Sequence, residues 1–125
     1  MIVLFPRLAA VLTCTALVGC ALEPVRETVP GEPYVRGAVE AFAHRATASS
    51  LLVRGGPGSR EPCGISATAD RQTRYLERDQ SGTLRQTDRS AIGIGDTVEV
   101  YVEGPVAESC PVQGRASVVV RVARS

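Results

Sequence analysis

Short segments in which apolar and polar residues alternate dominate the chain after residue 33. The clearest covers residues 97–103, where Val98, Val100 and Val102 alternate with Thr97, Glu99, Tyr101 and Glu103. A period of two with β-branched residues is typical of a strand that buries one face. Past residue 33 no segment longer than about one turn has a helical period, and the strand-like segments recur about every ten residues. Such a chain must pair its strands, and a closed or nearly closed barrel is the natural way to leave few edges unpaired.

The other strand-like segments can be located along the chain by the same alternation. We expect Val35, Gly37, Val39 and Ala41 to share one face of a first strand. Further strands are predicted at residues 48–54, 65–69, 73–78, 83–87 and 115–123. Residues 79–82 are a hairpin turn, and residues 88–91 suit a single helical turn capped by Asp88 or Ser90. In the last strand we expect the inward side chains to be Ala116, Val118, Val120 and Val122. The sequence therefore predicts an all-β fold, a small antiparallel β-barrel of about five to seven short strands.

The N-terminus has the parts of a secretory signal. Residues 8–22 carry no charge, and Arg7 is the only charged residue before Glu23. This apolar run is shorter than the roughly 20 residues that a membrane-spanning helix needs. It ends in Leu17-Val18-Gly19-Cys20, a pattern that resembles the lipobox of bacterial lipoproteins.

We predict a lipoprotein signal peptide at residues 1–19 and lipid attachment at Cys20. Gly19 supplies the small side chain that a peptidase needs next to the cut, and Cys20 supplies the thiol. Cys14, flanked by two threonines, is a weaker candidate. An uncleaved signal anchor and cleavage without lipid are the alternatives.

Downstream of Cys20 the prolines predict a linker at residues 20–33, followed by a single domain at residues 34–125. Loss of Arg7 with the signal reduces the 14 basic residues to 13, which equals the number of acidic residues. Aromatic residues are few, so the stacking platforms and the basic groove of a nucleic-acid-binding barrel are not expected.

Two further cysteines, Cys63 and Cys110, lie within the predicted domain. In an exported protein a disulfide is the default for such a pair. Two free buried thiols and a metal pair are the alternatives. With one distant histidine, His44, the cysteines are too few for a convincing zinc site, and we predict no metal.

Residues 95–113, with the sequence GDTVEVYVEGPVAESCPVQ, resemble the signature of the YobA-like family of small exported bacterial proteins, whose domain has no known function. The resemblance covers about residues 35–123 and implies an OB-like β-barrel. It brings no catalytic residues. Where the family tends to carry an aromatic residue, this chain has Cys110. A bond to Cys63 would compensate for the lost ring, which favours the disulfide.

Nothing in the sequence identifies a catalytic constellation. No partner for acid–base chemistry is evident near His44, which is interpreted as a solvated loop residue. Glu108 and Ser109 are expected to order their loop by bonding backbone amides. Glu99 and Glu103 flank Tyr101 on one strand face, which suggests a solvated outer face rather than a weak cation site.

We therefore predict a non-enzymatic binding module without a cofactor, anchored to the membrane of the cell envelope by its lipid. The candidate binding surface is the 104–114 loop with the face that carries Tyr101, and its residues are Tyr101, Glu108, Ser109 and Gln113. The ligand would be an envelope protein, a glycan or a small molecule. A structural or stress-related envelope protein without a discrete ligand is the alternative.

Overall fold

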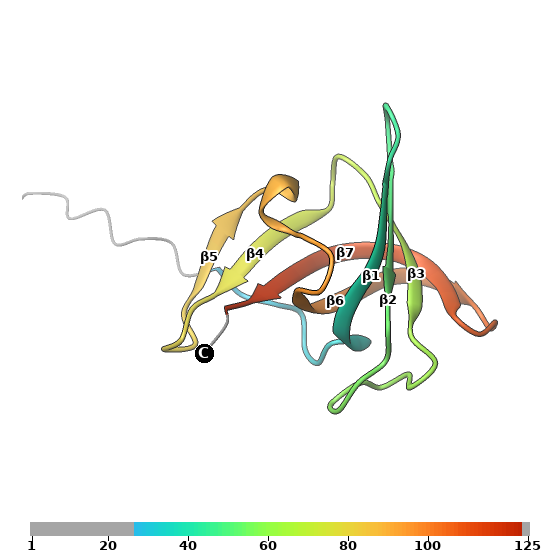
Figure 1. The fold of residues 1–125 in the computed structure, drawn as a ribbon, viewed down its shortest axis with the longest axis horizontal. Helices are drawn as coiled ribbons and strands as arrows, with labels where there is room; N and C mark the ends of the chain where they lie inside the picture. Colours follow the sequence, from blue (N-terminus) through green and yellow to red (C-terminus); the bar gives the residue numbers. More distant parts are fainter. Residues whose placement is uncertain (1–26, 124–125) are drawn as a thin grey trace, which may run out of the picture.

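The computed structural model describes residues 27–123, which form seven strands and one 3₁₀ turn (Figure 1). The predicted signal peptide, Cys20 and residues 20–26 of the predicted linker lie outside the described residues. In chain order the elements are β1 (Val35–His44), β2 (Ser49–Val53), β3 (Ile65–Ala69), β4 (Arg74–Arg78), β5 (Leu84–Thr87), η1 (Arg89–Ala91), β6 (Thr97–Ala107) and β7 (Val112–Val122).

Five of these strands close into a barrel. The sheet order is β3-β2-β1-β6-β7-β4-β5, and an additional pairing of β3 with β7 closes the ring. The long strand β7 changes partner along its length, since its first half pairs with β3 and its second half with β4, both in parallel. The predicted OB-like barrel is confirmed. The strands predicted at residues 73–78 and 83–87 are present as β4 and β5, but their position outside the barrel and the two parallel pairings of β7 were not evident from the alternation pattern.

Two β-bulges, one in β1 and one in β7, reverse the predicted inward and outward directions of the side chains that follow or precede them. Val39 pairs with Val53 and Ala41 with Leu52, so Glu40 is the extra residue in β1. Tyr101 pairs with Val118 and Val102 with Ala116, which leaves Ser117 as the extra residue in β7. A bulge inserts one residue and flips the alternation beyond it. Ala41 is consequently exposed, and Val118 and Val120 point out of the barrel, whereas Val119 points in.

The structure has two separate apolar clusters as a result. The barrel core is built mainly from valine, with Leu51, Ile65, Ile92 and small alanines. The outer cluster consists of Leu76, Tyr101, Val118 and Val120, between β4, β6 and β7. The predicted solvated face of β6 is therefore wrong at Tyr101, only 3% exposed, and at Glu99, only 8% exposed, whereas Glu103 is exposed as predicted. The extra strand β4 covers this face, which sequence periodicity on β6 alone does not reveal.

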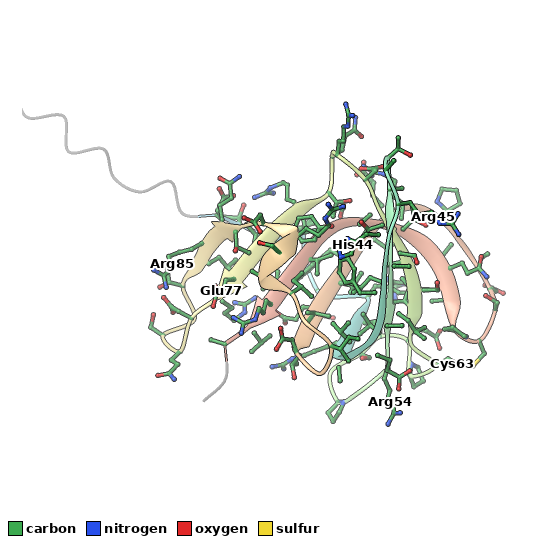
Figure 2. The ribbon with its side chains drawn as sticks, turned by 45° about the horizontal axis from the view of Figure 1, so that its top comes forward. His44, Arg45, Arg54, Cys63, Glu77 and Arg85 are labelled. Carbon is green, nitrogen blue, oxygen red and sulfur yellow. A yellow bond between two sulfur atoms is a disulfide. The ribbon has the colours of Figure 1, made fainter. Side chains whose placement is uncertain are left out.

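The segment predicted as a loop at residues 104–114 is mostly strand. β6 continues to Ala107 and β7 begins at Val112, so only residues 108–111 form a turn. A disulfide between Cys63 and Cys110, with 5.5 Å between the Cα atoms, ties this turn to the loop after β2. Cys63 lies at the end of the molecule opposite Arg85 on β5 (Figure 2). The predicted disulfide is confirmed, and it is compatible with an exported, non-cytoplasmic protein.

Two local predictions are also confirmed. The Asp79 carboxylate accepts hydrogen bonds from the backbone of Ser81 and Thr83, which forms the hairpin turn between β4 and β5. Asp88 caps η1 by accepting from the Ser90 backbone. Bonds from Ser81 and Ser90 hold the pKa values of Asp79 and Asp88 below their usual range.

Gly37 permits a close approach where β1 meets the chain that leaves β2. A Cβ atom at this position would lie 1.7 Å from the carbonyl oxygen of Arg54. The backbone of Arg54 bonds to Ala38 and that of Gly56 bonds to Arg36, so the two chains are tightly held together here. No other residue type fits without moving one of these backbones.

Candidate functional site

Residues 27–33, called the strap below, lie against the outside of the barrel although the sequence places them in the linker. Val29 packs against the outer cluster, and Glu27 forms an ion pair with Arg74. The following residue, Tyr34, donates its backbone N–H to the carbonyl of Val100 at 2.8 Å. The strap therefore covers part of the face that carries Tyr101.

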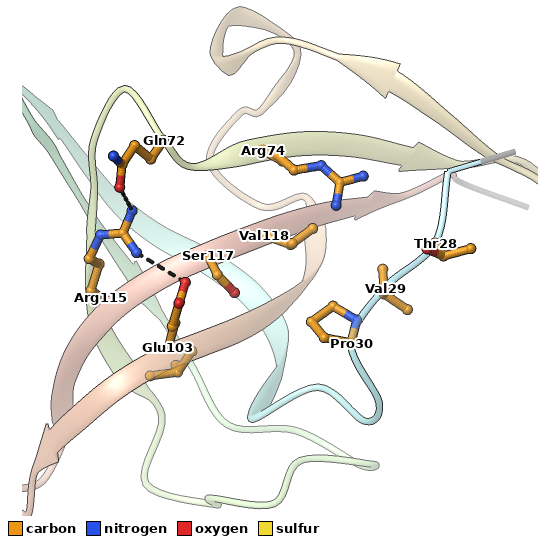
Figure 3. A pocket seen from close by; sticks show the side chains of 10 residues that line it. Thr28, Val29, Pro30, Gln72, Arg74, Glu103, Arg115, Ser117 and Val118 are labelled. Carbon is orange, nitrogen blue, oxygen red and sulfur yellow. Dashed lines mark hydrogen bonds and ion pairs between the residues drawn. The ribbon is translucent and has the colours of Figure 1, made fainter. Parts of the chain in front are cut away.

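A cavity of about 610 Å³, called the strap groove, lies between the strap and the outer face of β4, β6 and β7 (Figure 3). Its volume falls within the roughly 300–1,000 Å³ typical of small-molecule sites. The lining combines apolar and polar side chains: Thr28, Val29, Pro30, Gln72, Arg74, Val102, Glu103, Arg115, Ser117 and Val118.

The polar groups of the strap groove are already bonded to protein. Arg115 binds both oxygens of Asp70 at 2.7 and 3.0 Å, and it also reaches Gln72 and Glu103. Its guanidinium lowers the pKa of Asp70 to about 2, and the same bond raises the pKa of Arg115. Ser117 donates its hydroxyl to the carbonyl of Tyr101 at 3.2 Å. The strap groove thus presents apolar surface fringed by charges that neutralise one another.

A second cavity, called the end cavity, lies where three connections gather at the top of Figure 1. These are the β1–β2 turn, the β3–β4 connection and the junction between β5 and η1. The end cavity has a volume of about 510 Å³. Its lining consists of Ala46, Thr47, Ala48, Ser49, Ala69, Asp70, Arg71, Gln72, Thr73, Arg74, Tyr75, Gln86, Thr87, Asp88 and Arg89.

The framework of the end cavity is rigidly bonded. The hydroxyl of Thr73, a buried residue, donates to the carbonyl of Ala116 at 2.7 Å and accepts from the backbone N–H of Asp70. Arg89 donates to the hydroxyl of buried Ser49 at 2.9 Å. Burial raises the pKa of Tyr75, and the positive charge of Arg89 opposes that rise.

The structure does not bring the four predicted surface residues together. Tyr101 is buried in the outer cluster, where burial raises its pKa. Glu108 and Ser109 lie in the exposed turn, and Gln113 pairs with Ala107 beside it. Seven residues of extended chain separate Tyr101 from Glu108, a distance of roughly 20 Å. Tyr101 is therefore not part of a surface with the other three.

The bonding expected for Ser109 differs in detail. Its hydroxyl donates to the carbonyl of Pro111 at 2.6 Å rather than bonding backbone amides. The bond still orders the turn, as predicted for Ser109, because it links Ser109 to Pro111 across the turn.

The other residues singled out from the sequence have structural partners. Glu99 bonds to Arg78 at 3.0 Å, and Glu103 bonds to Arg115. His44 is the last residue of β1 rather than a loop residue, and its ring lies 4.4 Å from that of Phe42. Within residues 27–123 no group of three His, Cys, Asp or Glu side chains is placed to hold a metal ion.

Sequence reasoning missed the arginines at both cavities. Arg71, Arg74, Arg89 and Arg115 stand in segments where arginine is common, and nothing in their spacing distinguishes them. Asp70 and Arg115 are 45 positions apart, and only the parallel pairing of β3 with β7 makes them neighbours. No local signal predicts such a pair.

Comparisons with protein-family models, with curated proteins and with solved structures give no match. Within residues 27–123 no helix is long and apolar enough to cross a membrane.

Proposed function

We propose that this protein is an exported domain of the YobA-like type, anchored to the cell envelope by a lipid on Cys20, and that it binds a ligand without catalysing a reaction. The strap groove is the observation that supports a binding role most directly. It is a cavity of ligand size on a rigid barrel, bordered by a segment that continues toward the predicted anchor. The lipobox-like residues and the Cys63–Cys110 disulfide support the cellular location.

The dimensions of the strap groove favour a small ligand. A volume of about 610 Å³ suits a small molecule or a short piece of a glycan or peptide better than a flat protein surface. Val29, Val102 and Val118 supply apolar contact, and the fringing ion pairs leave no excess positive charge to select an anion. An uncharged amphipathic ligand therefore fits best.

The strap would also keep the groove near the membrane. Glu27 lies seven positions after Cys20 in the sequence, and a fully extended chain of this length spans at most about 25 Å. With Glu27 held by Arg74, a lipid on Cys20 would place the strap groove within that distance of the acyl chains. A ligand of the membrane surface or of the adjacent envelope is thus within reach.

The contacts of the reactive side chains support a binding role over catalysis. His44 stacks on Phe42, and Ser109 bonds to a backbone carbonyl. Neither arrangement resembles a nucleophile held by a general base.

Lipidation is tested by labelling cells that express the full chain with a palmitate analogue. We expect label on the wild-type protein and on Cys14→Ala, and none on Cys20→Ala. Two acyl chains hold a protein stably at a membrane, whereas one does not, so Cys20→Ala should also leave the membrane fraction. Label retained by Cys20→Ala would overturn the anchor.

Ligand binding is tested with a photoreactive amino acid placed at Thr28, at the rim of the strap groove, and at Ser81 as a control in the β4–β5 turn. We expect an envelope component to be crosslinked only from position 28. The purified component should then bind the wild type more tightly than a variant with Val118→Asp in the groove floor. Equal crosslinking from both positions, or none from either, would contradict the binding role and favour the structural alternative.

A further inference from the structure

We propose that the end cavity binds a phosphate group carried by a small solute or by a lipid headgroup. The end cavity differs from the strap groove in most of its lining and in the ligand proposed for it. This proposal does not depend on the lipid anchor or on the ligand of the strap groove. The end cavity contains hydrogen-bond donors that have no acceptor within residues 27–123.

Three side chains bring such donors to the end cavity from three elements. Arg71 comes from the β3–β4 connection, Tyr75 from β4 and Arg89 from η1. Among the described residues Arg71 has no ion-pair or hydrogen-bond partner, and neither does the hydroxyl of Tyr75. Arg89 uses one N–H on the hydroxyl of Ser49, which fixes the direction of its guanidinium and leaves its other donors available.

The carboxylates of the cavity do not neutralise these groups. Asp70 is held by Arg115, which binds both of its oxygens from outside the end cavity. Asp88 is occupied by the backbone and hydroxyl of Ser90 at the start of η1. The wall between the two cavities carries Arg74, whose partner is Glu27 of the strap. Arg115 balances the charge of Asp70, and Glu27 balances that of Arg74. Arg71 and Arg89 then give the end cavity two positive charges, and Asp88 offsets one of them.

The directions of the donors favour phosphate over carboxylate. A carboxylate has two oxygens in one plane and is best met by a single guanidinium. A phosphate presents three or four oxygens in a tetrahedral arrangement, which suits a cavity whose donors come from three different elements. Thr47 and Thr87 add hydroxyls on the rim for the rest of the ligand, and the volume of about 510 Å³ admits a group of monosaccharide size.

The strap groove provides an internal contrast. Its arginine, Arg115, is consumed by Asp70, Gln72 and Glu103. In the end cavity the corresponding charges have no such partners, although Gln72 and Arg74 line both sites. The same surface thus offers one electrically balanced groove and one that attracts an anion.

The test is a titration of the full chain with glycerol phosphate. Binding is measured by calorimetry and by the NMR signals of the arginine Nε–H groups. We expect saturable binding and a shift of the Arg71 and Arg89 signals. Arg71→Gln and Arg89→Gln should each weaken binding about tenfold or more, and Tyr75→Phe by a smaller factor. Arg85→Gln is the matched control, because Arg85 is an exposed arginine on β5 that does not line the end cavity.

Two competitors identify the source of the phosphate. Vesicles that contain phosphatidylglycerol will displace glycerol phosphate if the natural ligand is a lipid headgroup, and phosphatidylcholine vesicles are the control. Displacement by neither type of vesicle assigns the site to a soluble phosphate. Absence of saturable binding at millimolar glycerol phosphate with no binding to either vesicle would overturn the proposal. Stronger binding of lactate, or an equal loss in Arg85→Gln, would do so as well.

Discussion

The barrel interior and the outer cluster share strands β6 and β7 but differ in what surrounds them. The barrel core is enclosed by a ring of five strands, and the side chains packed in its cluster are apolar. The outer cluster is covered by β4, by Leu84 of β5 and by Val29 of the strap, and ion pairs such as Arg78–Glu99 lie along its edge. Both cavities lie at the border of this outer layer. The comparison indicates that the barrel provides most of the buried core, while the layer added to its outside forms the cavities in which we propose that ligands bind.

The two regions are joined through the bulge at Ser117. It allows β7 to place Ala116 and Val119 in the barrel core and Val118 and Val120 in the outer cluster. Because neighbouring residues of one strand belong to both regions, we expect the regions to unfold together. The predictions below test that expectation, beginning with the largest effect.

Replacement of both Cys63 and Cys110 by serine should lower the free energy of unfolding by about 4 kcal/mol. The bond closes a loop with a sequence separation of 47 residues, and its loss raises the entropy of the unfolded chain. Urea unfolding of the wild type with and without reductant checks the value. Reductant should leave the double variant unchanged, and an equal stability of variant and wild type would show that the barrel does not depend on this crosslink.

Leu51→Ala in the barrel and Leu76→Ala in the outer cluster should each cost about 3 kcal/mol, because each removes a fully buried side chain. Thermal unfolding followed by far-UV and near-UV circular dichroism should show one shared transition for both variants. A separate early transition in Leu76→Ala would break the comparison, since it would make the outer layer an independently melting unit.

Val29→Ala should loosen the strap at a cost of about 1 kcal/mol, because Val29 is only partly buried. Hydrogen exchange of the Tyr34 amide, which donates to Val100, is the measurement. We expect faster exchange there and little change in the barrel. Thr28→Ala, an exposed change in the same segment, serves as the control, and equal acceleration by both variants would argue against packing of Val29 as the cause.

The acid dependence contributed by Asp70 should be the smallest effect, since its side chain is about one-third exposed. Its folded pKa of about 2 lies below the ordinary value of 3.8, so folding favours the ionised form. This contribution to stability is present above pH 4 and is lost as the pH falls from about 4 to 2. Asp70→Asn and Arg115→Gln should both lose less stability than the wild type over this window. Parallel acid curves for all three proteins would show that the ion pair does not set the pKa.

The part of the fold that was predictable is the part controlled by neighbouring residues. Alternating valines indicated β6, and Asp79 and Asp88 indicated a turn and a cap, because each of these signals acts over a few positions. Cys63 and Cys110 were paired correctly because the chain offers no other partners within the domain. The predicted side-chain direction was wrong at Ala41, Val118 and Val120, because a bulge of one residue leaves no mark in the composition of a strand.

The candidate site was the least predictable part. The predicted surface joined Tyr101 to Glu108, Ser109 and Gln113, but Tyr101 is buried in the outer cluster, Glu108 and Ser109 lie on a distant turn, and Gln113 lies beside that turn in β7. The linings of both cavities include arginines and hydroxyl groups. The β3–β7 and β4–β7 pairings place these side chains beside residues that are distant in the sequence. Parallel pairing joins segments dozens of residues apart, and its register depends on the whole sheet.

The amino-acid sequence by itself determined that this chain forms a strand-rich barrel that carries a disulfide, because side-chain alternation and cysteine count are local or compositional properties. Only the tertiary structure decided which faces are buried and where a ligand can bind. The reason is physical: burial and cavity shape depend on which strands lie side by side, and the partners of β7 are chosen by packing across the entire molecule.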